Sequence, residues 1–163
     1  MAEMSDAEVG EVDLAVVAYR DDGDWHVADL PDRCLDTVTT IGEELRRYPA
    51  ENGAIALVSV AEDFVLVLRV QGTTLRVLLS DGSAATDWTL ARSAVDHIGV
   101  HVDVDDEQAP VGDLAVLADL GVSAEEMAAL LDDYDLLTDE MLSEIADGAG
   151  FGPKFDNLVG ISE

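Results

Sequence analysis

The stretch FVLVLRV at residues 64–70 decides the fold. In an extended strand, Phe64, Leu66, Leu68 and Val70 share one face, while Val65 and Val67 lie on the other. A strand that is apolar on both faces is normally covered on both. The sequence therefore predicts a sheet with a layer on each side. Apolar residues at helical spacing over residues 35–48 supply one layer, and the second requires the C-terminal helices or another subunit.

The segments around this strand predict an antiparallel sheet of five strands. Apolar runs separated by turn-forming residues such as Asp22-Gly23 and Gln71-Gly72 indicate strands joined as hairpins. With the helix, the order is ββαβββ, an α+β fold whose succession also occurs in longin-like and profilin-like domains. The predicted strands cover residues 12–20, 25–30, 54–61, 64–70 and 74–80.

The chain beyond the sheet changes to helical periodicity. Residues 84–98 predict one broken helix, and residues 113–120 predict a helix that ends at Gly121. Ser123 with Glu126 forms a capping box, Thr138 starts a helix that Gly148 closes, and residues 153–159 add a short last turn. The expected organisation is a disordered acidic tail, a sheet domain, an acidic linker and a small all-helical region, at residues 1–11, 12–102, 103–110 and 111–163.

Acidity dominates the composition. Lys and Arg total 8 against 36 Asp and Glu, a formal net charge of −28, and Lys154 is the only lysine. Residues 1–102 hold 19 acids and 7 arginines (−12), and residues 103–163 hold 17 acids and one lysine (−16). This balance argues against direct binding of nucleic acid or of an anionic membrane, because both need cations. It suits a basic protein partner, or it only maintains solubility.

Several features predict a cytoplasmic protein of about one domain. Hydrophobic residues make up 48% of the 163 residues, enough for a core, but no apolar run approaches the ~20 residues of a membrane span. The N-terminal residues 1–6 lack the basic and apolar regions of a signal peptide. Cys34 is the single cysteine, which excludes an internal disulfide and a cysteine-based zinc site.

No pattern in the sequence predicts catalysis, a metal or a cofactor. His97, His101, Asp103 and Asp105 form a cluster of ligand-type residues, but this spacing is more typical of the solvated face of an acidic strand, and we expect no metal there. Residues 103–108 lack the glycine of a calcium loop, since Gln108 occupies its position. The glycines of residues 148–152 follow a helix, not a strand, and therefore predict a helix stop.

Four aromatic residues are candidates for partner contacts. Aromatic side chains anchor interfaces, although each is more often part of a core. The candidates are Trp88, Tyr134, Phe151 and Phe155.

Several segments together resemble a known family. The opening strand after an acidic tail and residues 78–85, 112–123 and 146–151 are similar to the tRNA adenosine deaminase-associated proteins of high-GC Gram-positive bacteria. The resemblance covers residues 12–159 in the same order and implies association with the deaminase, with no catalytic residues to carry over. Zinc deaminases need His-x-Glu and Pro-Cys-x-x-Cys. Here Val27 and Ala28 follow His26 and no second cysteine exists, so the chain is not that deaminase.

The leading hypothesis is therefore a non-catalytic acidic partner or regulator of a tRNA adenosine deaminase in bacterial tRNA modification. Its charge would steer it by protein–protein interaction onto the basic face of a tRNA-binding enzyme. Two alternatives stay open: an α+β domain that binds or converts a small molecule, and a self-associating structural module such as a homodimer.

Overall fold

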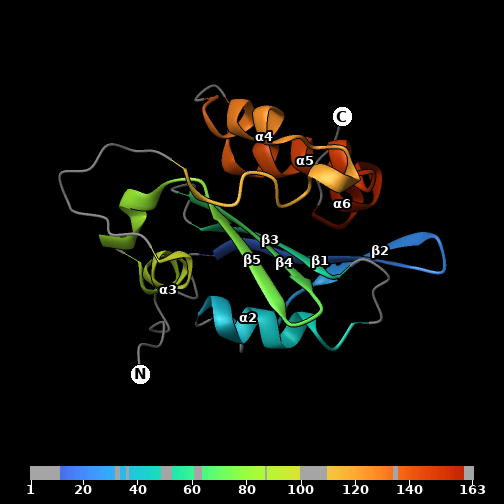
Figure 1. The fold of residues 1–163 in the computed structure, drawn as a ribbon. Helices are drawn as coiled ribbons and strands as arrows, with labels where there is room; N and C mark the ends of the chain where they lie inside the picture. Colours follow the sequence, from blue (N-terminus) through green and yellow to red (C-terminus); the bar gives the residue numbers. More distant parts are fainter. Residues whose placement is uncertain are drawn as a thin grey trace.

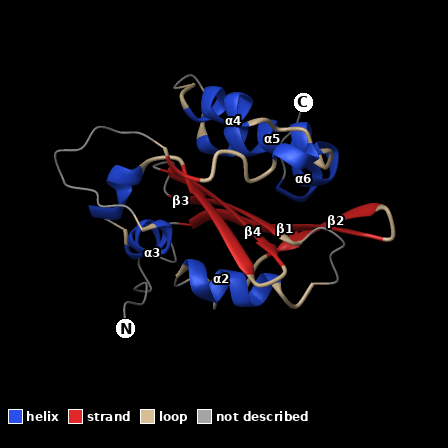
Figure 2. Ribbon diagram, viewed as in Figure 1, coloured by secondary structure: helices blue, strands red, loops and turns tan. Residues whose placement is uncertain are grey.

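The described part of the chain forms three layers, with a sheet between two groups of helices (Figure 1). Helices α2 and α3 lie on one side of the sheet, and α4, α5 and α6 lie on the other (Figures 1 and 2). The α+β class predicted from the sequence is confirmed. The computed structural model describes residues 12–31, 34–35, 37–48, 53–60, 64–86, 88–99, 110–133 and 136–159.

The sheet has six strands in the order β2-β1-β3-β4-β5-β6, and all neighbours are antiparallel. The three predicted hairpins, β1–β2, β3–β4 and β4–β5, are confirmed. Positive φ angles at Asp22 (55°) and Gly23 (82°) give the first hairpin a type I′ turn, which matches the twist of its strands. The strands are β1 (Val12–Asp21), β2 (Asp24–Asp29), β3 (Ile55–Val60), β4 (Phe64–Gln71), β5 (Thr74–Leu79) and β6 (Val111–Gly112).

Strand β4 is buried on both faces, as its pattern predicts. Phe64, Leu66, Leu68 and Val70 belong to the core under α2 and α3. Val65 and Val67 belong to a second core under the C-terminal helices. These helices, and not another subunit, therefore cover the second face in this structure.

The first helical layer consists of α2 (Val38–Leu45), α3 (Thr89–Ile98) and a short 3-10 helix, Gly82–Thr86. The Thr37 side chain accepts from the N–H of Thr40 (3.2 Å) and starts α2. The Val38 N–H donates to Ser93 Oγ of α3 (3.0 Å), so the start of α2 is bonded to its neighbour. Helix α2 is shorter than the predicted 35–48.

The second layer consists of α4 (Ala124–Leu131), α5 (Thr138–Ala149) and α6 (Gly152–Val159). Ser123 is confirmed as the N-cap of α4, since its Oγ accepts from the N–H of Glu126 (3.1 Å). The buried hydroxyl of Ser59 in β3 donates to Thr138 Oγ1 (2.7 Å) and bonds α5 to the sheet. Helix α5 ends at Gly150 (φ 104°), two residues beyond the predicted stop at Gly148.

Two predictions about the chain after Pro110 were wrong. Five strands were expected, but Val111–Gly112 forms β6, which pairs with Leu78 and Leu79 of β5. A helix was expected over residues 113–120, but this segment consists of turns and a short 3-10 helix, Ala118–Leu120. Gly112 (φ 107°) approaches β5 so closely that a Cβ there would lie 2.2 Å from Val77 O.

Two predicted segments lie outside the described residues: the acidic tail, residues 1–11, and residues 103–109 of the linker.

Candidate binding surfaces

Arg69 of β4 and Arg76 of β5 hold the segment that leads from the sheet to the C-terminal helices. They are cross-strand partners on the face covered by these helices. The Arg69 side chain is 0% exposed and donates from Nη1 to Val116 O (3.0 Å). It also donates to both carboxylate oxygens of Asp119, with Nη2 3.0 Å from Oδ2. This two-point contact fixes the segment against the sheet.

Arg76 makes a parallel set of bonds. Its Nε donates to Asp113 Oδ2 (2.6 Å), its Nη2 to Ala115 O (2.9 Å) and its Nη1 to Gln71 Oε1 (2.9 Å). The two arginines therefore donate to the backbone carbonyls of Val116 and Ala115, which in a helix would accept hydrogen bonds from the helix's own N–H groups. The Asp113 carboxylate also accepts from the N–H of Ala115 (3.0 Å), a local bond that competes with helix formation. These contacts explain why residues 113–120 are not a helix.

The ion pair between Arg69 and Asp119 changes the pKa of the Asp119 carboxyl group. The pKa of Asp119 is lowered, mainly because its carboxylate accepts hydrogen bonds from Arg69. Partial burial of the carboxyl group acts in the opposite direction and raises the pKa, but by less. A lowered pKa in the folded state stabilises the protein above the unfolded pKa, about 3.9. That contribution is lost as the pH falls through the lower folded pKa.

We therefore expect the stability difference between the natural protein and Asp119→Asn to depend on pH. The difference in unfolding free energy should be constant from pH 7 to about 5 and should shrink as the pH falls from about 4 through the lower folded pKa, below which the side chain at position 119 is neutral in both proteins. Denaturant titrations at several pH values measure it. A difference that does not change between pH 7 and 3 would contradict the linkage.

The outer surface of the C-terminal helices is strongly acidic. Residues 110–159 hold 12 acids and one lysine, a formal charge of −11. Two of these acids, Asp113 and Asp119, pair with arginines of the sheet. The exposed acids on and directly after α4 and on α5 are Glu125, Glu126, Asp132, Asp133, Glu140, Glu144 and Asp147. This group is called the acidic face below.

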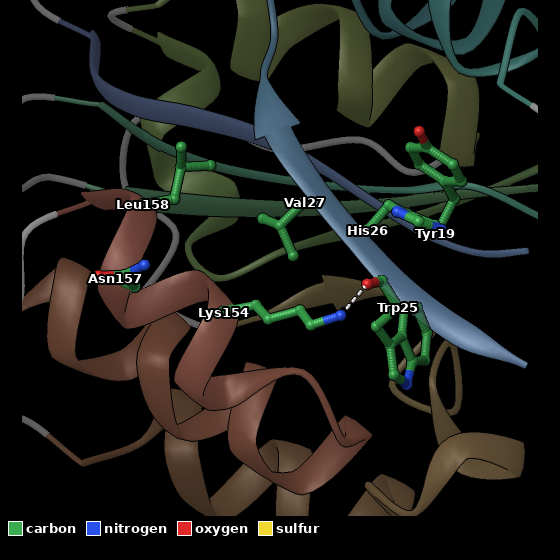
Figure 3. A pocket seen from close by; sticks show the side chains of 7 residues that line it. All are labelled: Tyr19, Trp25, His26, Val27, Lys154, Asn157 and Leu158. Atoms are coloured by element: carbon green, nitrogen blue, oxygen red, sulfur yellow. Dashed lines mark hydrogen bonds between the residues drawn. The ribbon is translucent and has the colours of Figure 1, made fainter.

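An open pocket of about 440 Å³ lies between β2 and α6. Figure 3 shows the side chains that line it. Lys154 of α6 points across it and its Nζ donates to the backbone carbonyl of Trp25 (Figure 3). No carboxylate within the described residues lies within ion-pair distance of this lysine. The other lining residues are Tyr19, His26, Val27, Asn157 and Leu158.

The aromatic rings around this pocket pack against neighbouring side chains. The Trp25 ring lies 4.8 Å from Phe151 and 5.7 Å from the Arg20 guanidinium. Tyr19 stacks on His26 with ring centroids 5.2 Å apart. The rings therefore support the hairpin, and Tyr19, Trp25 and His26 also line the pocket.

Of the predicted histidine cluster, only His97 lies in the described part of the chain. Its Nε2 lies 3.0 Å from Leu75 O, at the rim of a second open hollow of about 460 Å³. His101, Asp103 and Asp105 lie outside the described residues. Where residues are described, no three His, Cys, Asp or Glu side chains form a group that could hold a metal. Cys34 is buried, 3% exposed.

The three candidate aromatics that the structure describes, Trp88, Phe151 and Phe155, do not gather on one surface. Phe151 and Phe155 are 1% and 0% exposed, so they pack in the core under the C-terminal helices and are not available to a partner. Trp88 is partly buried against the first core, with its ring 6.1 Å from Phe64. Tyr134 lies outside the described residues.

Sequence reasoning missed the pocket, because Lys154 and Trp25 are 129 positions apart. The one feature of the sequence that could have indicated this pocket is that Lys154 is the only lysine in a chain with 36 acids.

The fold and these surfaces define an acidic α+β protein in which a sheet lies between two helical layers, with an acidic face and an edge pocket as candidate binding surfaces. None of the described helices is long and apolar enough to cross a membrane. The model of the Rv3753c-like tRNA adenosine deaminase-associated protein family matches residues 13–152. The chain belongs to this family.

One curated relative illustrates the match. Protein Rv3753c of Mycobacterium tuberculosis (strain ATCC 25618 / H37Rv) is 28% identical over 150 residues, which cover 90% of this chain and 87% of that protein. No solved structure matches the chain, so the expected likeness to longin-like and profilin-like domains stays a prediction.

Proposed function

We propose that this protein is a non-catalytic partner of a tRNA adenosine deaminase and that its acidic face binds the enzyme's basic surface. The family's description, which associates its members with that deaminase, carries the proposal. The sequence also lacks the ligand set of the zinc deaminases, which leaves the chemistry to the enzyme.

The charge distribution supports the acidic face as the contact. Residues 124–159, which contain the second helical layer, hold 10 acids and one lysine, a formal charge of −9. That lysine, Lys154, is bonded to the edge of β2. A tRNA-binding enzyme carries cations that neutralise phosphates. An acidic surface would compete with tRNA for these cations and would be steered onto them over long range.

Binding to the deaminase is expected to weaken steeply with salt. Debye screening shortens from about 30 Å at 0.01 M to about 8 Å at 0.15 M, so attraction between exposed charges is largely lost. Titration calorimetry with the purified deaminase at these two salt concentrations measures the effect, and added tRNA should compete. Absence of binding at low salt would contradict a direct partnership.

A pair of charge reversals locates the contact. Glu125→Lys with Glu144→Lys changes the acidic face, and Glu43→Lys with Asp96→Lys makes the same charge change on the opposite layer. The first variant should lose more than tenfold in affinity and the control less than threefold. Equal losses would indicate attraction to the whole molecule, without a defined face.

A further inference from the structure

Strand β2 is an outermost strand of the sheet, and its register defines which backbone groups are open. The two-residue turn makes Asp21 and Asp24 a pair that exchanges backbone hydrogen bonds. Hydrogen-bonded pairs alternate along an antiparallel ladder, so the next ones are Tyr19 with His26 and Val17 with Ala28. The same alternation places a bond from Leu30 N to Ala15 O, which is observed at 2.9 Å. The residues between these pairs direct their N–H and C=O groups away from β1. They are Trp25, Val27 and Asp29.

These outward groups are only partly used. The carbonyl of Trp25 accepts from Lys154 Nζ, which confirms its direction away from β1 (Figure 3). In the part of the chain that the structure describes, no side-chain or loop hydrogen bond reaches the outward groups of Val27 and Asp29. An open strand edge of this kind is a template for another strand.

The pocket lies beside this edge. It is lined by His26 and Val27, whose side chains lie on opposite faces of β2, and by Asn157 and Leu158 of α6. Residues from both faces line one space only where that space lies at the strand's edge. Leu158 is 37% exposed, so it offers an apolar contact to a side chain of an added strand.

The charges beside the edge select a basic occupant. Asp24 and Asp29, at the two ends of β2, are exposed, and the whole chain carries −28. A second copy of this chain would bring the same acids to the same edge and would be repelled. Among the described residues, two cations lie beside the strand: Lys154 of α6, and Arg20 of β1, whose guanidinium lies 5.7 Å from the Trp25 ring. A lysine at an edge opposes unwanted strand pairing.

We propose that the edge of β2 binds an extended basic segment of the protein partner as an added strand, which displaces Lys154 from Trp25. This inference rests on the proposed function and names the mode of contact. Backbone hydrogen bonds to Val27 and Asp29 would supply affinity, and Asp24 and Asp29 would select arginine or lysine in the bound segment.

Val27→Pro tests the proposal in the full chain. Proline removes the outward N–H but keeps the bonds between β1 and β2, and edge strands tolerate it on the solvent side. Affinity for the purified deaminase is expected to fall at least tenfold. Val27→Ala, which keeps the N–H, should change it less than threefold. Circular dichroism and thermal melting establish that both variants are folded.

Lys154→Ala separates this occupant from a small anion. It should tighten binding of the deaminase two- to tenfold, because it frees the Trp25 carbonyl and removes a cation facing a basic segment. Weaker binding on this change would instead indicate an anionic group held by Lys154 and would overturn the proposal.

Amide hydrogen exchange of the unmodified complex keeps the test independent of variant folding. The N–H groups of Val27 and Asp29 should exchange at least tenfold more slowly when the deaminase is bound. If the deaminase binds without slowing exchange at these groups, or binds Val27→Pro as tightly as the natural protein, the strand addition is overturned and the partnership stands. No binding by the natural protein overturns both, and a dimer lost in Val27→Pro assigns the edge to a second copy.

Discussion

Replacement of Asp119 by alanine is expected to destabilise the protein by about 3 kcal/mol, the lower end of the cost of breaking a buried ion pair, because Arg69 is buried while Asp119 is half exposed. The Arg69 side chain is 0% exposed and would keep its bond to Val116 O but lose both bonds to the carboxylate. A buried guanidinium without its counter-charge is costly because burial removes its hydration. Urea denaturation at pH 7 measures the loss.

The reverse change should cost less. In Arg69→Met, the carboxylate that remains is 51% exposed and can be hydrated, while methionine retains much of the buried volume. We expect Asp119→Ala to be the more destabilising variant and the double variant Arg69→Met with Asp119→Ala to recover stability relative to it. A double-mutant cycle gives the coupling, and a coupling near zero would contradict the role assigned to the pair.

Local sequence chemistry predicted most of the sheet. Asp22-Gly23 and Gln71-Gly72 specify tight hairpin turns, and the two apolar faces of residues 64–70 require a layer on each side. These features depend on neighbouring residues only. The observed register and both cores follow from them.

Interactions between distant residues produced the errors. The periodicity of residues 113–120 is helical, but side chains of Arg69 and Arg76, roughly forty to fifty positions away, bond this segment to the sheet. A tertiary contact of this kind overrides intrinsic propensity. The edge pocket likewise depends on Lys154 and Trp25, which no local pattern connects.

The burial of Phe151 and Phe155 leads to the second large effect. The sequence suggested both as candidate partner contacts, because aromatic side chains anchor interfaces, although each is more often part of a core. In the structure, Phe151 packs its ring 4.8 Å from that of Trp25, and Phe155 is 0% exposed in the second core. Both rings therefore hold α6 against the sheet.

Phe155→Ala is accordingly expected to destabilise the protein by about 3–5 kcal/mol, the usual cost of deleting a buried phenylalanine. Leu158→Ala lies on the same helix at a side chain that is 37% exposed, and it should change stability by less than about 1 kcal/mol. Thermal and urea denaturation of the two variants at equal salt measure the contrast. If Phe155 were instead a partner contact, its replacement would weaken deaminase binding and leave the melting temperature unchanged. We expect the opposite result: Phe155→Ala lowers the melting temperature. Because α6 carries Lys154, binding at the edge of β2 should change only under conditions in which α6 detaches from the sheet.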